Sequence, residues 1–349
     1  MKHRIDITNF FLIWLTLGVA INWPFQLFLF SYIVLGPLHY LTEINWLDKQ
    51  NYFLRAKDSR PFVWSMVVLV VLLSICTILP ETEHWKSTHS IHEAIFNSPD
   101  QTVVHVLRWS YSLLLLAFVT AAAWVFTTHW LARALIAAFC LLCSLMFYTN
   151  PVVALLFGVL LPTIFHVFFF TIIFMLYGTL KTRSAWGYVN VASMLLALLV
   201  IAVTNRTVTP YSLGQPVIDL TDTSSFGQVN LVINKFLGNL GTGGGIDLYS
   251  PAFWRVQTFI AFAYTYHYLN WFSKTSIIKW HQVEKTKLAF SALLWITSIS
   301  LYKLDYRLGF AAITAVSVLH VVLEFPLNFI SMRSVFGALV VKKKMAAPL

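Results

Sequence analysis

The chain has 349 residues, of which 58% are hydrophobic and only 11% carry a charged Asp, Glu, Lys or Arg side chain. A soluble globular protein has about 25% charged residues, so this composition excludes a water-soluble enzyme and predicts a protein embedded in lipid. The net charge of +10 does not indicate a nucleic-acid partner, because the basic residues occur in short runs between apolar stretches, as membrane topology signals do.

The apolar stretches predict the membrane spans in chain order. The first, residues 8–43, is too long for one upright helix and is interrupted at Asn22-Trp23-Pro24, where proline ends or kinks a helix, so it forms either one kinked span or two short ones. Further runs long enough to cross a bilayer are 62–79, 104–127, 131–148, 152–178, 185–204, 252–273, 285–302 and 308–331. The sequence therefore predicts an all-α, polytopic integral membrane helical bundle with nine or ten transmembrane helices in a single domain, residues 1–349.

The charged segments between the spans predict the orientation. When the spans alternate, one side receives the basic segments, and by the positive-inside rule that side is the cytoplasm: 44–61, 180–184, 273–287 and the tail Lys342-Lys343-Lys344. The opposite side receives 80–103 and the long segment 205–250, which we expect to be an extracytoplasmic loop or flap. The basic N-terminus is cytoplasmic only if residues 8–43 cross twice. We therefore favour ten spans with both termini in the cytoplasm, and we expect a bacterial inner membrane.

Four histidines lie inside the predicted spans, where an ionisable side chain is costly and indicates function: His39, His166, His267 and His320. At about 1.5 Å of rise per residue, all four fall in the cytoplasmic half or near the middle of the membrane. Glu43 follows His39 by four residues and Glu324 follows His320 likewise, which places each acid on the face of its histidine. Four neutral imidazoles with supporting carboxylates predict an iron site, with copper or zinc as alternatives. For each histidine, the other interpretation is a hydrogen bond to a neighbouring helix.

Aromatic residues surround two of these histidines. Tyr264 and Tyr266 lie deep enough beside His267 to support the ligands or to form cavity walls, whereas Tyr268 and Trp271 fit the aromatic belt at the cytoplasmic boundary. The phenylalanines next to His166 are expected to line an apolar substrate tunnel: Phe165, Phe168, Phe169 and Phe170.

The segment Gly36-Pro37-Leu38-His39-Tyr40-Leu41-Thr42-Glu43 resembles the Gly-Leu-Pro-His-Gly-Ala-Leu-Asp signature of the Brp/Blh family, bacterial integral-membrane β-carotene cleaving dioxygenases. The resemblance implies an iron held by four membrane histidines. A later span of that family carries a His-x-x-x-His pair, and Tyr264–Trp271 looks like this span, with His267 matching the first histidine and Trp271 in the place of the second. The resemblance thus implies ligand roles for His39 and His267, while His166 and His320 are proposed from their depth.

Two functions of different classes fit these observations. The first is a membrane-embedded metal-dependent oxygenase or related oxidoreductase that acts on a long apolar lipid or isoprenoid substrate. The second is a membrane transport or assembly subunit without chemistry, in which the histidines and glutamates form a proton path or contacts between helices. The expected partners are membrane lipids and an apolar small molecule, and no nucleic acid.

Overall fold

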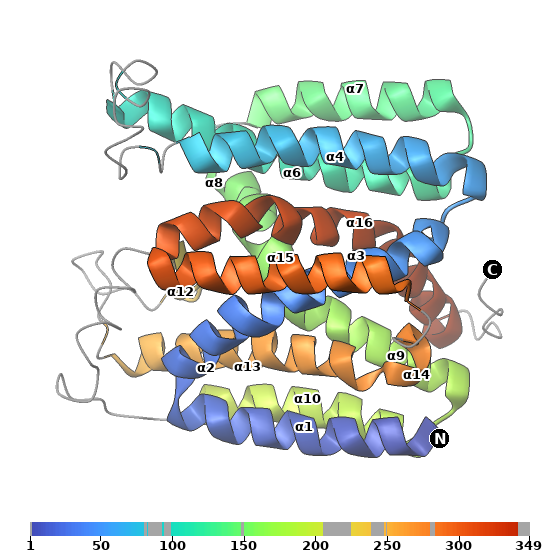
Figure 1. Ribbon diagram of the computed structural model, residues 1–349, viewed down its shortest axis with the longest axis vertical. Helices are drawn as coiled ribbons and strands as arrows, with labels where there is room; N and C mark the ends of the chain where they lie inside the picture. Colours follow the sequence, from blue (N-terminus) through green and yellow to red (C-terminus); the bar gives the residue numbers. More distant parts are fainter. Residues whose placement is uncertain are drawn as a thin grey trace. The chain divides into compact units, whose positions relative to one another are not determined.

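The computed structural model describes residues 2–79, 99–147, 150–204, 225–238, 250–279 and 283–340, together with residues 82, 93 and 248. These residues form helices and contain no strand, which confirms the predicted all-α membrane fold (Figure 1). The tail Lys342-Lys343-Lys344 and most of segment 205–250, which both entered the predicted topology, lie outside the described residues.

Helices occupy all the predicted spans, including both halves of residues 8–43. Within the described residues, seven helical stretches are long and apolar enough to cross a membrane: Arg4–Asn22, Pro24–Lys49, Ala56–Ile78, Trp109–Phe126, Leu155–Thr182, Ala185–Val203 and Tyr306–Val340. The other predicted spans correspond to α7 (Trp130–Phe147), α13 (Pro251–Ser273) and α15 (Lys285–Leu304). The apolar part of α7, Trp130–Ser144, is shorter, while α13 and α15 contain more polar residues.

The N-terminal stretch forms two candidate spans. Helix α1 (Lys2–Asn22) ends before Trp23, and Pro24 begins α2 (Pro24–Phe30), because a proline at the first helical position lacks only an N–H that would have no partner there. Helix α2 continues through a π-helical turn, η1 (Ser31–Leu35), into α3 (Gly36–Lys49).

The chain packs as two compact units, and the first comprises Met1–His39 and Ile164–Val283. Its central helix is α13, which packs against α1, α2, η1, α10 (Ala185–Val203) and α12 (Ser225–Phe236). Helix α9 (Thr171–Thr182) forms a hairpin with α10. Because α13 is covered on several sides by other helices, its many polar side chains meet protein and not lipid, which explains its lower apolarity.

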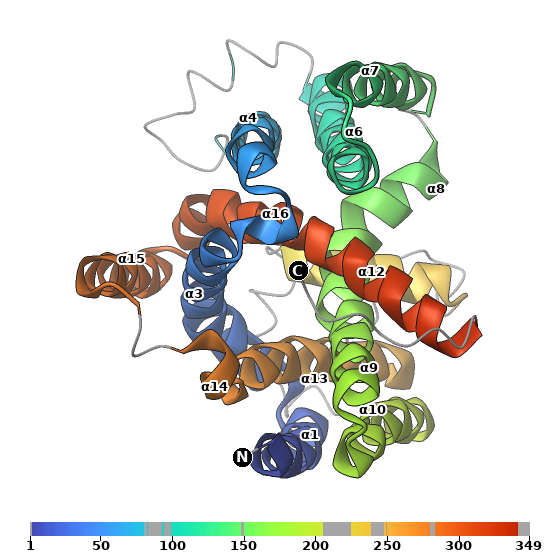
Figure 2. The same ribbon diagram turned by 90° about the vertical axis from the view of Figure 1, so that its right-hand side faces the viewer.

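The second unit comprises Tyr40–Thr163 and Glu284–Val340. Helix α16 (Tyr306–Val340) packs against α15, α6 (Pro99–Phe126), α4 (Ala56–Ile78) and the short turn η2 (Asn51–Phe53). Figure 2 shows α4, α6 and α7 end-on. Arg133 on α7 makes two 3.1 Å hydrogen bonds to the Asp58 carboxylate on α4 and stacks on the Trp124 ring of α6 at 3.9 Å, so one guanidinium ties these three helices together.

Candidate metal centre

Two of the predicted ligands are positioned by π-helical segments. His39 lies on α3, one turn after η1, and His166 lies within the long π-helical segment η4 (Ala154–Phe170), which follows the short α8 (Pro151–Val153) and contains Pro162. A π-helix places more than four residues in each turn and therefore directs side chains differently from an α-helix, and such segments are frequent at functional sites. The orientation of both imidazoles thus depends on an irregularity in the helix that carries them.

His39 and His267 meet inside the first unit. Their Nε2 atoms lie 3.1 Å apart, and their rings are 4.8 Å apart in an edge-to-face arrangement. The two side chains are 1% and 6% exposed. Two nitrogens bound to one metal at about 2.0–2.2 Å lie about 2.8–3.6 Å apart when the coordination angle is about 90–110°. The observed separation is compatible with a shared metal, and it is also the distance of a hydrogen bond between the two rings.

Thr171, the first residue of α9, determines which nitrogen of His267 is available. Its hydroxyl donates its single proton to the Val167 carbonyl at 3.0 Å, so the hydroxyl oxygen, 2.8 Å from His267 Nδ1, accepts the proton of that nitrogen. In neutral His267 the lone pair is then on Nε2, the atom that faces His39. A hydrogen-bonded Nδ1–H is the arrangement that orients metal-binding histidines.

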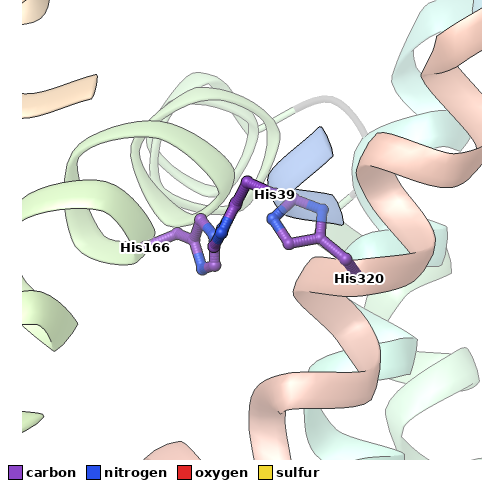
Figure 3. A group of neighbouring side chains, drawn as sticks. All are labelled: His39, His166 and His320. Atoms are coloured by element: carbon purple, nitrogen blue, oxygen red, sulfur yellow. The ribbon is translucent and has the colours of Figure 1, made fainter. Parts of the chain in front are cut away.

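His166 and His320 complete the group of predicted ligands. The His166 ring is 4.9 Å from that of His267. His39, His166 and His320 each offer one ring nitrogen, and these nitrogens lie within 4.8 Å of one another (Figure 3). His320 stacks on Tyr40 at 4.2 Å, and Tyr40 is joined to His39 by a peptide bond. Three buried histidines could therefore hold a metal ion, and His267 lies beside two of them.

The other residues predicted to belong to the site have varied surroundings. Glu43 and Glu324 are both buried, so neither carboxylate faces lipid. Tyr264 packs against Phe28 and Tyr32, whereas the Tyr266 hydroxyl donates to Asn9 Oδ1 at 3.2 Å and so fastens α13 to α1. A supporting role for these residues stays a prediction.

The predicted tunnel residues next to His166 divide between the interior and the surface. Phe168 is buried and packs against Phe259, and Phe170 is also buried. Phe165 and Phe169 are exposed and touch each other edge to face, with ring centroids 5.9 Å apart. Only Phe168 and Phe170 therefore belong to the interior of the first unit, and a tunnel remains a prediction.

Three residues that the sequence did not assign to the site contact its histidines. Thr171 binds His267, as described. The Tyr268 ring lies 5.0 Å from His39 and 5.6 Å from His267, and the Trp271 ring lies 5.6 Å from His39. The sequence predicts Tyr268 and Trp271 as part of an aromatic belt, and in the structure both rings pack on His39. Trp271 follows His267 by four residues, and this spacing is a sequence signal that places it on the same face of the helix. Tyr268, the next residue after His267, has no such signal.

Comparisons with protein-family models, curated proteins and solved structures found no match to this chain. The function is therefore argued from the residues of the site.

Proposed function

We propose that this protein is a membrane-embedded, metal-dependent oxygenase or related oxidoreductase that acts on a long apolar lipid or isoprenoid substrate. The observation that carries the proposal is the 3.1 Å separation of His39 Nε2 and His267 Nε2, with the His267 tautomer determined by Thr171. The alternative to a shared metal is a hydrogen bond between the two imidazoles, which would need no further histidine nearby. The metal is favoured because three buried histidines, His39, His166 and His320, could hold an ion, and His267 lies beside His39 and His166.

The donor set suits a transition metal. Neutral imidazole nitrogens suit iron, copper and zinc, and of these we propose iron, which the resemblance to the Brp/Blh signature also implies. Bound iron would supply redox chemistry with dioxygen, while the chain supplies orientation and exclusion of bulk water. Tyr268 and Trp271 cover His39 with apolar ring surface, so they shield this ligand from water.

The position of the site selects the substrate class. His166 is buried, but its neighbours Phe165 and Phe169 on the same helical segment are exposed on an apolar candidate span. A molecule dissolved in the bilayer can therefore reach the helix that carries a ligand without crossing water. Carotenoids, other isoprenoids and unsaturated acyl chains share this solubility, and their double bonds are susceptible to oxidation.

Metal analysis of the detergent-purified protein, followed by an oxygenation assay, tests the proposal. We expect about one iron per chain after anaerobic reconstitution with Fe(II). We also expect consumption of dioxygen with β-carotene or an unsaturated lipid, and incorporation of ¹⁸O from labelled dioxygen into the product. Protein that binds no metal and consumes no dioxygen would refute the proposal and favour the transport or assembly subunit.

A further inference from the structure

Helix α16 carries a row of buried polar residues that extends away from the candidate metal centre. His320, Glu324, Asn328 and Ser331 are spaced by four, four and three residues. At about 100° per residue they fall within a sector of about 80° on one face of the helix, over a length of about 17 Å. All four are buried, and Asn328 and Ser331 are 0% exposed. On an apolar candidate span, such a row needs hydrogen-bond partners.

At the far end of the row, no group within the described part of the chain supplies those partners. Among the described residues, Asn328 Nδ2, Asn328 Oδ1 and Ser331 Oγ have no hydrogen-bond partner. Two buried amides of the first unit differ, because Asn230 donates to Gln257 Oε1 at 3.2 Å and Asn234 donates to Asn230 Oδ1 at 2.6 Å. Buried polar groups without a protein partner are ordinarily satisfied by internal water.

A polar pair, Tyr52 and Asp48, lies at the turn that packs against α16. Turn η2 packs against α16, and its Tyr52 is buried against Phe62, with ring centroids 6.2 Å apart. Tyr52 forms a side-chain hydrogen bond with Asp48, whose side chain is 53% exposed. The exposed Asp48 carboxylate and its hydrogen bond to Tyr52 therefore give solvent a polar contact at a turn that packs against α16.

We propose that the Glu324–Asn328–Ser331 face of α16 holds a file of internal water molecules that connects the Asp48–Tyr52 turn to His320. Neighbouring positions of the row are about 5–6 Å apart, a gap that one water bridges with two hydrogen bonds of about 2.8 Å. The hydration of this face stands independently of the metal. Its use, the supply of water and protons to the centre, rests on the proposed oxidoreductase function.

X-ray footprinting of the full-length protein in nanodiscs tests the water file, because radiolysis of internal water oxidises adjacent side chains. We expect oxidation of the α16 peptide that spans residues 320–331 despite its burial. The double variant with Asn328→Leu and Ser331→Ala should lower this oxidation severalfold. Thr314→Val is the control, since the Thr314 hydroxyl already donates to the Phe310 carbonyl at 2.7 Å and lies off the row.

Two outcomes would overturn the water file. One is a native 320–331 peptide as unreactive as the buried stretch 260–263 of α13, and the other is oxidation that the double variant leaves unchanged. If the double variant does not fold, Ser331→Ala alone should still lower the oxidation. Iron content is measured on the same samples. Oxidised α16 without iron would refute only the metal, whereas bound iron with an unreactive α16 would refute only the water file.

Discussion

The Nε2 atoms of His39 and His267 lie 3.1 Å apart, although 228 residues separate the two histidines in the chain. His39 reaches this position on a helix that follows a π-helical turn, and His267 reaches it on the central helix of the first unit. Each ring is enclosed by aromatic side chains, with Tyr268 in contact with both. Two imidazoles whose ring nitrogens face each other in a buried site are arranged to share a cation or a proton.

Replacement of either histidine should abolish metal binding. His39→Ala or His267→Ala removes a ligand and leaves a cavity that cannot complete the coordination, so we expect less than about a tenth of the native iron content. Elemental analysis after gel filtration gives the measurement. His129→Ala is the matched control, because His129 is exposed and precedes α7. Equal iron content in all three variants would show that these imidazoles are not ligands.

Stability should fall at alkaline pH in part because of Tyr52. Burial, with the nearby Asp48 carboxylate, raises the pKa of Tyr52 above its ordinary value of about 10. Above pH 10 the unfolded chain loses the phenolic proton while the folded protein retains it, so this contribution is complete below pH 10 and is lost as the pH rises toward the folded pKa. We expect the native melting temperature to decrease more steeply between pH 9 and 11 than that of Tyr52→Phe. Tyr188→Phe, at an exposed position, should behave like the native protein.

The fold was predictable because lipid restricts the choice of structure. A chain of this composition must satisfy its backbone hydrogen bonds within helices, so each long apolar run predicts one helix, and Pro24 predicts the break in the first. The π-helical segments were not predictable. A π-helix replaces the usual hydrogen bonds between residues i and i−4 with bonds between residues i and i−5. The amino-acid composition of Ala154–Phe170 does not distinguish this segment from an apolar α-helix.

The sequence identified the buried histidines by residue type and depth, but it did not indicate their contacts. The cost of an imidazole in a span singles out four histidines, and their depths allow them to meet. Which helices are neighbours depends on packing between segments distant in sequence, so nothing indicated that Thr171 would bind His267. The contact between Trp271 and His39 was missed for the same reason, since it depends on how α3 packs against α13.

The orientation in the membrane can be tested by cysteine labelling. In a background without Cys76, Cys140 and Cys143, we expect Lys57→Cys to react with an impermeant maleimide only after the cells are opened, and Ser225→Cys to react in sealed cells. Lys57 is an exposed residue at the start of α4, and Ser225 begins α12. The charge distribution between the loops is the reason for this expectation. The reverse labelling pattern would invert the topology.

The α9–α10 hairpin should be sensitive to a single methyl group. A Cβ at Gly187 would clash with Thr179 Oγ1, so Gly187→Ala should destabilise the protein by about 1–3 kcal/mol through overpacking. Thr179→Ala, added to the Gly187→Ala variant, should restore much of the lost stability. Gly178→Ala on the same hairpin meets nothing within 4 Å and should be neutral or stabilising. Thermal unfolding in detergent measures all four proteins, and a Gly187→Ala variant as stable as Gly178→Ala would contradict the close approach.

Thr171 should control the metal affinity without being a ligand. Thr171→Val keeps the shape of the side chain but removes the oxygen that accepts the His267 Nδ1 proton, so the ring loses its orientation and its preferred tautomer. Removal of such a supporting hydrogen bond typically lowers metal affinity by about 10–100-fold. Thr171→Ser retains the hydroxyl and should bind metal nearly as the native protein does.

Competition with a chelator of known affinity measures this effect, and a ¹⁵N NMR spectrum of the metal-free protein labelled at histidine reports the tautomer directly. We expect a His267 Nδ1–H signal in the native protein and in Thr171→Ser. In Thr171→Val the signal should change as the Nε2–H form becomes populated, because Nδ1 has lost its acceptor. Unchanged affinity and an unchanged spectrum in Thr171→Val would mean that His267 is oriented by its aromatic neighbours, Tyr268 among them, and not by Thr171.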